Sequence, residues 1–496
     1  METLTVALGQ LATWSVILAA FGGVLWGILG GALPGISPSI AMALLLPFTV
    51  GMDPTTALVL LASVYVGAEY GGSIPAILIR TPGTNSASAT VTDGYAMAQQ
   101  GRAGEALGIS LISGLWGGLF GLLVLVLATE SLAQVALAFT PAAYFALGIL
   151  GLSVIAGLSG GSLLKGLIAA GFGLSIAFVG SDPVSGVPRF TFDSADLLGG
   201  VKPILIMVGL FAVTEMLVQI TEPDWAKANK SLARLKLPNW AMSKRLFKPQ
   251  AIGAAVGTVE GVTPGAGGTI AAFMAYSEAK RWSRHPEEFG HGSPEGIAAP
   301  EAANNVVTAT ALVPLLSLGI PGSNSAAILM GGFLIHGLQP GPMLFSKAPE
   351  VVYGLYGGLF LANIAMLLLG LVILAPCIWL VNRPKPYLIA GILALVMSGV
   401  YAIHQSLFEI FLVIGVGVFG YVMRWLKVPV LPLVLGLVLG YMVESNFRRS
   451  LVISGGDPMI FLTDKVSLGL LLLAALLTTY TAWKEFSGGK KKAVTA

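Results

Sequence analysis

Long apolar segments separated by short polar loops run through nearly the whole chain. They lie at 11–33, 55–79, 103–129, 141–158, 162–180 and 201–221, and then at 250–279, 303–319, 323–337, 351–380, 387–403, 406–423, 429–445 and 466–483. A helix that crosses a bilayer needs about 20 apolar residues, and several of these segments are shorter or interrupted by Gly and Pro. The pattern predicts an all-α, polytopic integral membrane protein with about 10–14 helices, some of them broken.

Composition supports the bilayer as the solvent of this chain. Hydrophobic residues make up 55% of the 496 residues and charged residues only 10%, whereas soluble domains carry about 25% charged residues. The net charge of +3 is too small for a nucleic-acid-binding surface. The single cysteine, Cys377, excludes an internal disulfide, and the four histidines show no metal-ligand spacing.

Basic residues in the loops predict the orientation in the membrane. The stretch 225–249 holds seven Lys and Arg residues and is the strongest cytoplasmic signal. It also divides the chain into a first half, 1–224, and a second half, 250–496, which carries an extra C-terminal helix. Counting crossings from this linker places the N-terminus outside and the C-terminus, with Lys490, in the cytoplasm. Because the first ten residues contain no Lys or Arg, the first segment is expected to be a retained helix rather than a secretory signal.

The two halves contain related sequence. Gly31, Pro34, Gly35, Ile40 and Ala41 recur at a constant offset as Gly261, Pro264, Gly265, Ile270 and Ala271. At a second constant offset, six residues of the window 75–87 recur between 314 and 326, where about one identity is expected by chance. The loop count gives the copies opposite senses through the membrane, and inverted repeats with broken helices are typical of secondary transporters. The alternative is a coincidence between Gly/Pro-rich turns.

Two turns within the repeats carry the residues expected to bind substrate. Pro and Gly interrupt the helix, and the hydroxyl and Asn residues that follow are good caps for a new helix. At mid-membrane depth, a re-entrant helical hairpin would present free N–H groups and a positive helix end to an anion. The alternative is an ordinary cap at the membrane surface. The predicted substrate-binding residues are Thr81, Pro82, Gly83, Thr84, Asn85 and Ser86 in the first turn, and Pro321, Gly322, Ser323, Asn324 and Ser325 in the second.

A second set of residues is expected to line the cavity or to bind a coupling ion. It consists of the other broken pair, Pro34, Gly35 and Ser37 with Pro264 and Gly265, the acids Glu69 and Glu260, and the amides Asn304 and Asn305. Charged groups in hydrocarbon are costly and usually face a cavity or a partner, so Glu69 and Glu260 are candidate proton or cation carriers. Glu301 also sits beside a broken segment. The alternatives are a simple kink for the broken pair and an interfacial position for the acids.

These motifs resemble those of the large membrane subunit of the tripartite tricarboxylate transporters, the TctA family. The likeness rests on GALPGISPS, YGGSIPAILIRTPGTNSASATVTDGY, VEGVTPGAGG, EAANN and VPLLSLGIPGSNSAAIL, and it covers nearly the whole chain. It implies uptake of citrate-like di- or tricarboxylates by symport with Na⁺ or H⁺ across the bacterial inner membrane. It also implies two partners, a periplasmic substrate-binding protein and a small membrane subunit, and no cofactor. The Asn-Ser turns are similar to the hairpin tips of carboxylate transporters that use an elevator motion, which is an analogy only.

Three classes of function compete on the sequence. A secondary active permease, for carboxylates or another small organic anion, fits the inverted repeats. An intramembrane enzyme would need a nucleophile–base pair or a set of paired carboxylates, and HExxH and CxxC motifs are absent from the sequence. A channel usually needs a ring of identical chains around one filter. The sequence therefore favours a permease, and leaves open the carboxylate, the choice of Na⁺ or H⁺ and the oligomeric state.

Overall fold

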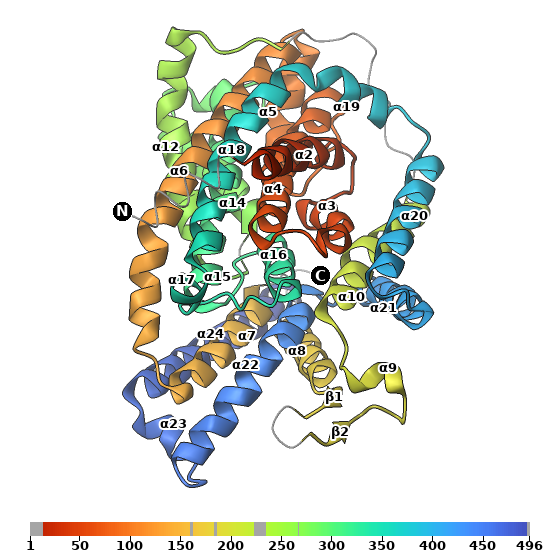
Figure 1. Cartoon of the computed structure of the whole chain (residues 1–496). Helices are drawn as coiled ribbons and strands as arrows, with labels where there is room; N and C mark the ends of the chain where they lie inside the picture. The colour runs from red at the N-terminus through yellow and green to blue at the C-terminus, as the bar shows by residue number, and fades with distance from the viewer. Residues whose placement is uncertain (1–12, 159–161, 183–185, 223–234, 266, 494–496) are drawn as a thin grey trace. The chain divides into compact units, whose positions relative to one another are not determined.

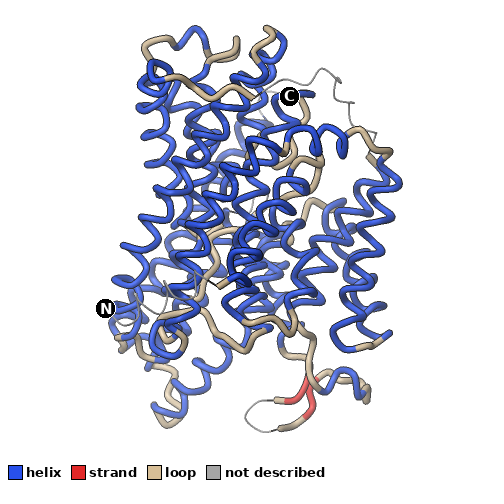
Figure 2. The backbone as a smooth tube through the Cα atoms, turned by 45° about the horizontal axis from the view of Figure 1, so that its top comes forward, coloured by secondary structure: helices blue, strands red, loops and turns tan. Residues whose placement is uncertain are grey.

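The computed structural model describes residues 13–158, 162–182, 186–222, 235–265 and 267–493 (Figure 1). Most of them are helical, and the described residues contain one short antiparallel strand pair, β1 (Gly180–Ser181) and β2 (Pro188–Arg189) (Figure 2). Eight helices of the described chain are long and apolar enough to cross a membrane, and four apolar helices are shorter. The predicted all-α, polytopic membrane class is confirmed at this level.

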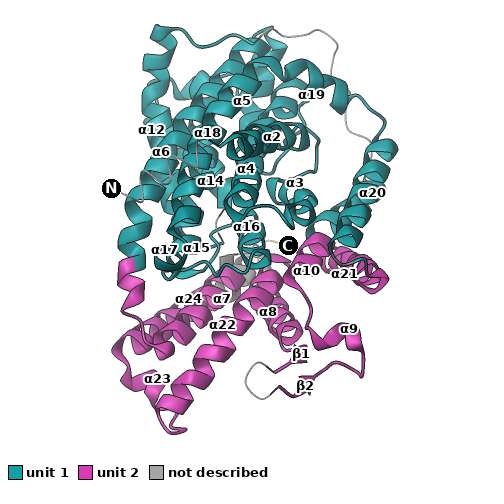
Figure 3. Cartoon of the chain, viewed as in Figure 1, with its two compact units in different colours: residues 1–133, 211–405 teal, residues 134–210, 406–496 magenta. Residues whose placement is uncertain are grey.

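The described residues form two compact units that interleave along the chain (Figure 3). Unit 1 consists of residues 1–133 and 211–405, and unit 2 of residues 134–210 and 406–496. The predicted halves at 1–224 and 250–496 concern sequence repeats and stay a prediction. Of the predicted linker 225–249, residues 225–234 lie outside the described residues, and the last ten residues already belong to a helix that begins at Trp240.

Unit 1 contains both sequence repeats. The first comprises α2 (Trp14–Gly31), α3 (Pro38–Leu45), the 3₁₀ turn η1 (Leu46–Thr49), α4 (Pro54–Ile79), α5 (Ser88–Gln99) and α6 (Ala103–Leu137), whose last turn belongs to unit 2. The second comprises α12 (Trp240–Val262), α13 (Gly267–Trp282), η3 (Pro286–Glu288), α14 (Pro294–Thr310), α15 (Leu312–Leu318), α16 (Asn324–Ile335), α17 (Leu344–Lys347) and α18 (Pro349–Val372). The remaining elements are α11 (Thr214–Thr221), α19 (Leu374–Val381) and α20 (Lys385–His404).

Unit 2 contains the other helices of the described chain. They are α7 (Pro141–Leu158), α8 (Leu163–Ala177), α9 (Ala195–Leu198), α10 (Pro203–Met207), the π-helical η2 (Val208–Val213) that leads into α11, α21 (Leu407–Trp425), α22 (Leu431–Ile453), α23 (Ile460–Thr463) and α24 (Lys465–Ala493). An ion-pair cluster ties the β1–β2 hairpin to α22: Arg448 lies 2.9 Å from Asp182, and Arg189 lies 2.7 Å from Glu444. This cluster fixes the polar end of α22 within the unit.

Glycine seams hold the first helices of both repeats close to their neighbours. On α2, Gly23, Gly27 and Gly31 face the backbone of α4, and a Cβ on Gly27 would lie 2.3 Å from Val64 O. On α12, Gly253, Gly257 and Gly261 face α14, and a Cβ on Gly257 would lie 2.5 Å from Ala303 O. Small residues spaced by four let helix backbones approach closely in membranes. The α2–α4 and α12–α14 pairs are therefore built on the same spacing of glycine.

Candidate functional site

The first Pro-Gly bend ends α4 and turns back against it. Arg80 has a left-handed backbone (φ 59°) and closes the helix. The N–H of Thr81 donates to Pro75 O at 3.4 Å, and the N–H of Gly83 donates to Gly72 O at 3.0 Å. The bend thus folds onto the last turns of the helix that leads into it.

The second bend repeats these contacts at matching positions. Gly319 is left-handed (φ 75°) at the end of α15. The N–H of Ile320 donates to Pro314 O at 3.2 Å, and the N–H of Gly322 donates to Ala311 O at 3.2 Å. The sequence repeat therefore corresponds to a repeat of backbone geometry at the two bends.

In both bends the hydroxyl side chains after the Pro-Gly pair are buried and the asparagine side chain is exposed. Thr84 accepts a hydrogen bond from the N–H of Ala87 at 3.4 Å, and Ser323 accepts one from the N–H of Ala326 at 3.1 Å. The buried hydroxyl residues are Thr84, Ser86, Ser323 and Ser325. The amides Asn85 and Asn324 are exposed. The hydroxyls therefore hold the bends in place, and the two asparagine side chains lie on their exposed side.

Each bend packs on the helix break of its own repeat. A Cβ on Gly83 would lie 1.8 Å from Gly31 O, at the end of α2, and a Cβ on Gly322 would lie 2.7 Å from Gly261 O, near the end of α12. In the second repeat the N–H of Gly265 also donates to Gly322 O at 3.0 Å. The predicted broken segments and the predicted bends are thus neighbours in both repeats.

The predicted residues at 34–37 and 264–265 take part in turns, in a helix cap or in packing. Gly35 and Gly265 both have positive φ, 86° and 90°. Ser37 caps α3 by accepting from the N–H of Ile40 at 3.4 Å. Pro34 is buried and Pro264 is half-buried. A Cβ on Gly35 would lie 1.8 Å from Nε2 of Gln219, so α11 covers this break.

One face of α4 contacts both bends. Ser86 of the first bend donates a short hydrogen bond to the Glu69 carboxylate. Tyr65, one turn earlier on α4, has its hydroxyl 3.4 Å from Oγ of Ser323 in the second bend. Since Tyr65 and Glu69 are both almost fully buried, the structure brings the two predicted bends together around the centre of α4.

The two asparagines of α14 lie beside this face and retain unpaired atoms. Nδ2 of Asn305 donates to Oδ1 of Asn304 at 3.1 Å and to Glu301 O at 2.9 Å. Nδ2 of Asn304 and Oδ1 of Asn305 are buried without a hydrogen-bond partner in the described structure. At the start of α13, a Cβ on Gly268 would lie 3.7 Å from both Glu69 Oε1 and Ser86 Cβ, and 4.0 Å from Asn304 Cα. The pair therefore adds polar atoms to the junction of the bends.

Glu260 is the predicted residue that the structure does not bring into this group. It is half-buried near the end of α12 and has no hydrogen-bond or ion-pair partner among the described residues. Thr81 and Pro82 are half-buried and Pro321 is buried at the base of the bends. In the described parts of the chain, no group of three or more His, Cys, Asp or Glu side chains is placed to hold a metal ion.

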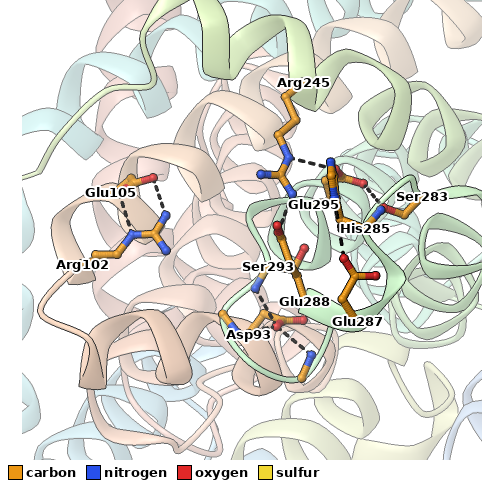
Figure 4. A network of polar contacts seen from close by, with 12 residues as sticks. Asp93, Arg102, Glu105, Arg245, Ser283, His285, Glu287, Glu288, Ser293 and Glu295 are labelled. Atoms are coloured by element: carbon orange, nitrogen blue, oxygen red, sulfur yellow. Dashed lines mark hydrogen bonds and ion pairs between the residues drawn. The ribbon is translucent and has the colours of Figure 1, made fainter.

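A polar network at one end of unit 1 anchors α5 and α14 (Figure 4). Oδ1 of buried Asp93 on α5 accepts from the N–H groups of Gly290, Gly292 and Ser293 at 2.8–2.9 Å, and Oδ2 accepts from the hydroxyl of Tyr276 at 2.9 Å. These bonds fix the loop that leads into α14 against α5.

Arginines complete the network. Arg245 of α12 donates to Glu295 at 2.9 Å and also pairs with Glu288. Arg102 pairs with Glu105 at 2.8 Å, and this hydrogen bonding raises the pKa of Arg102. The polar end of the unit is therefore held by compensated charges, in contrast to the junction of the bends.

Sequence reasoning missed several side chains of the junction. Tyr65 carries no motif of its own, and its counterpart in the second repeat is Asn304, a different residue type. Thr90 and Ser110 are each one of several hydroxyl residues in α5 and α6, and no local pattern distinguishes them from the others. Glu301 was recognisable as an acid beside Asn304, but its contact with the first repeat depends on the packing of α5 against α14.

The fold and the site together define a polytopic α-helical membrane protein with paired broken helices, which is an arrangement of transporters. A family model described as the tripartite tricarboxylate transporter TctA family matches residues 17–435. The chain belongs to this family.

Curated relatives are similar along much of the chain but have no described activity. An "uncharacterized 52.8 kDa protein in TAR-I ttuC' 3'region" of Agrobacterium vitis is 38% identical over 459 residues, which is 92% of this chain and 91% of that protein. An "uncharacterized protein in TAR-II ttuC' 3'region" of the same organism is 35% identical over 215 residues, 43% of this chain and 89% of that protein. No solved structure matches the chain.

Proposed function

We propose that the chain is the large permease subunit of a tripartite uptake system for citrate-like di- or tricarboxylates. Membership of the TctA family supports this function and implies two partners, a periplasmic substrate-binding protein and a small membrane subunit. Transport would be secondary and active, driven by a Na⁺ or H⁺ gradient across the bacterial inner membrane, without a cofactor. The N-terminus would lie outside and the C-terminus in the cytoplasm.

Alternating access would depend on two inverted repeats, each with a re-entrant hairpin. The hairpins would be α4–bend–α5 and α15–bend–α16. The paired hydrogen bonds of Thr81 with Pro75 and of Ile320 with Pro314 support a common origin for the two. Opposite orientation is supported by the basic linker at 225–249 between the copies. Two such halves can exchange conformations and so open one side and then the other.

The observation that carries the proposal is the matched exposure of Asn85 and Asn324 at bends that meet on one face of α4. The amide NH₂ groups can donate to a substrate carboxylate. The N-termini of α5 and α16, which begin at Ser88 and Asn324, add a favourable dipole. At α5 this contribution is the dipole alone, because the N–H groups of its first three residues already donate to backbone carbonyls. Glu69, next to both bends, is the proposed carrier of the coupling ion.

Uptake of a labelled carboxylate by cells with all three components tests this assignment. Asn85→Ala and Asn324→Ala should each lower uptake about tenfold or more, because losing hydrogen bonds to a charged group costs about 1.5–3 kcal/mol. Membrane insertion should be unchanged. Asn382→Ala, an amide at the end of α19 outside both bends, is the matched control. Wild-type uptake in both bend variants would refute the binding role.

The kinetics of flux separate a permease from the other classes. In proteoliposomes, a permease gives saturable uptake that follows an imposed Na⁺ or H⁺ gradient. Flux proportional to the carboxylate concentration would indicate a channel, and turnover by protein free of vesicles would indicate an enzyme.

A further inference from the structure

Glu301 on α14 is a fully buried acid that the proposed mechanism has not used. Its two carboxylate oxygens accept hydrogen bonds from hydroxyls of the first repeat, Oγ1 of Thr90 on α5 and, at 3.0 Å, Oγ of Ser110 on α6. Oγ of Ser110 in turn lies 2.6 Å from Oγ of Ser73 on α4. Three helices of the first repeat therefore converge on one carboxyl of the second.

The acids at this junction have no cationic partner. In the described chain, no Lys, Arg or His forms an ion pair with Glu301 or Glu69, although both carboxyls are 5% exposed or less. This differs from Glu295, near the start of the same helix, which pairs with Arg245. Burying an unpaired charge is strongly unfavourable, and such a group takes up a proton or a cation.

The other groups around Glu301 do not supply the missing charge. From α4, Glu69 and Tyr70 face it. From α5, Asp93 lies three residues beyond Thr90, and its carboxylate is already held by backbone N–H groups and by Tyr276 of α13. α12 contributes the neutral Gln250, which donates to Ser113 of α6. Glu301 therefore lies among neutral and acidic groups.

Glu69 and Glu301 hold the same end of α5. Ser86, in the bend just before α5, bonds to Glu69, and Thr90, in the first turn of α5, bonds to Glu301. Next to both acids, Oδ1 of Asn305 is buried without a partner, so an oxygen that could face a bound cation is already in place. Nδ2 of Asn304 is also buried without a partner, and as a donor it could face a water.

We propose that Glu69 and Glu301 form a two-carboxyl site that holds at least one monovalent cation, a proton or Na⁺, whenever α5 is packed as in this structure. The proton or Na⁺ enters from one aqueous side and leaves to the other, so no covalent bond changes. Releasing it leaves two negative carboxylates in one buried site, which favours separation of α5 from α14. This inference rests on the proposed transport function and assigns to Glu301 the role of a second coupling carboxyl.

Thermal unfolding of the purified chain in detergent tests cation binding without any transport partner. If the folded protein binds a proton that the unfolded chain does not, stability falls as the pH rises. The melting temperature of the wild type should therefore fall by several degrees between about pH 6 and about pH 8. If Na⁺ is the cation, NaCl should restore stability at about pH 8 and choline chloride should not. Glu301→Gln should remove much of this dependence, whereas Glu105→Gln, at an acid paired with Arg102, should leave it unchanged.

Transport with all three components provides the second readout. Glu301→Gln should lower gradient-driven accumulation about tenfold while carboxylate exchange across the membrane continues, because exchange needs no net cation movement. A wild type that transports no carboxylate would refute the proposed function, not this inference. A transporting Glu301→Gln variant with unchanged gradient dependence and unchanged pH and Na⁺ dependence of melting would overturn the inference.

A third variant covers the case in which Glu301→Gln does not fold. Thr90→Val keeps the carboxyl but removes one hydroxyl that stabilises its charged form. The midpoint of the pH dependence of melting should then move to higher pH. An unmoved midpoint would overturn the proposal.

Discussion

Gly83 and Gly322 are the residues at which the bends approach the rest of unit 1 most closely. The space around Gly83 is the tighter of the two, since a Cβ there would lie 1.8 Å from Gly31 O, compared with 2.7 Å between Gly322 and Gly261 O. Both neighbours are backbone atoms, which cannot move without shifting a helix. Adding a Cβ at either glycine is therefore expected to displace the whole bend.

Gly83→Ala should lower the melting temperature of the detergent-solubilised protein more than Gly322→Ala does. Overpacking of this kind costs about 1–3 kcal/mol or more. Gly22→Ala is the control, because nothing lies within 4 Å of a Cβ at Gly22 on α2, and Ala in a helix is favourable. Equal melting temperatures for the Gly83 and Gly22 variants would show that the bend is not packed on α2.

At the residue scale, the sequence predicts the bends better than their surroundings. Pro, Gly and Asn carry strong local preferences, so the motifs at 81–86 and 320–325 indicate both the break and the cap. Tyr65 and Glu301 have no such preference that relates them to the bends. Their contacts with Ser323 and Thr90 span 258 and 211 residues of sequence, and only tertiary packing establishes them.

At the scale of elements, α5 is held by acids at its start and at its middle. Glu69 bonds to the bend just before it, Glu301 bonds to its first turn, and Asp93, at its middle, ties it to the loop before α14. The Asp93 contact involves three backbone N–H groups of a short loop. Nε2 of Gln100 adds one more hydrogen bond, to His291 O at 2.8 Å, so most of the described hydrogen bonds that hold the loop 290–293 come from the Asp93 side chain.

Asp93→Ala should destabilise the protein strongly, since each buried N–H left without an acceptor costs about 1–3 kcal/mol. Asp93→Asn retains one oxygen for these N–H groups and should lose less. Tyr276→Phe removes a single hydrogen bond and should cost about 1 kcal/mol. Melting temperatures in detergent would check the order Ala, then Asn, then Phe. An Asp93→Ala variant as stable as Tyr276→Phe would contradict the anchoring role.

Hydropathy predicted most of the helices but not their grouping. The segment at 201–221 was expected as one helix, and it is continuous through α10, the π-helical η2 and α11. Its two ends nevertheless belong to different units, because Leu210 is the last residue of unit 2 in this part of the chain. Apolar patterns report that a segment is buried in lipid or protein, and they carry no information about which neighbour it packs on.

At the scale of the whole molecule, the charged loops make a prediction about sidedness. The loop and helix start at 235–248 carry Lys and Arg, whereas the stretch 446–465 is mixed in charge. The positive-inside rule then places Lys244 in the cytoplasm and Asp457 outside. Both side chains are exposed, so each can be replaced by a reporter.

Cysteine labelling checks this arrangement. In a Cys377→Ala background, which removes the single native thiol, Asp457→Cys should react with a membrane-impermeant maleimide in intact spheroplasts. Lys244→Cys should react only after the membrane is opened. Labelling of Lys244→Cys in intact spheroplasts would reverse the predicted topology, and labelling of both would mean that the spheroplasts leak.

The two bends are chemically alike, but the residues that begin them are not. Position 80 is Arg and position 319 is Gly, and both adopt a left-handed backbone, which costs a residue with a Cβ about 1–2 kcal/mol and glycine almost nothing. Arg80 is held there in part by its guanidinium above the ring of Tyr95, 5.9 Å away. The backbone at the end of α4 is therefore strained, whereas the backbone at the end of α15 is not, so two bends with matching hydrogen bonds differ in conformational energy by about 1–2 kcal/mol.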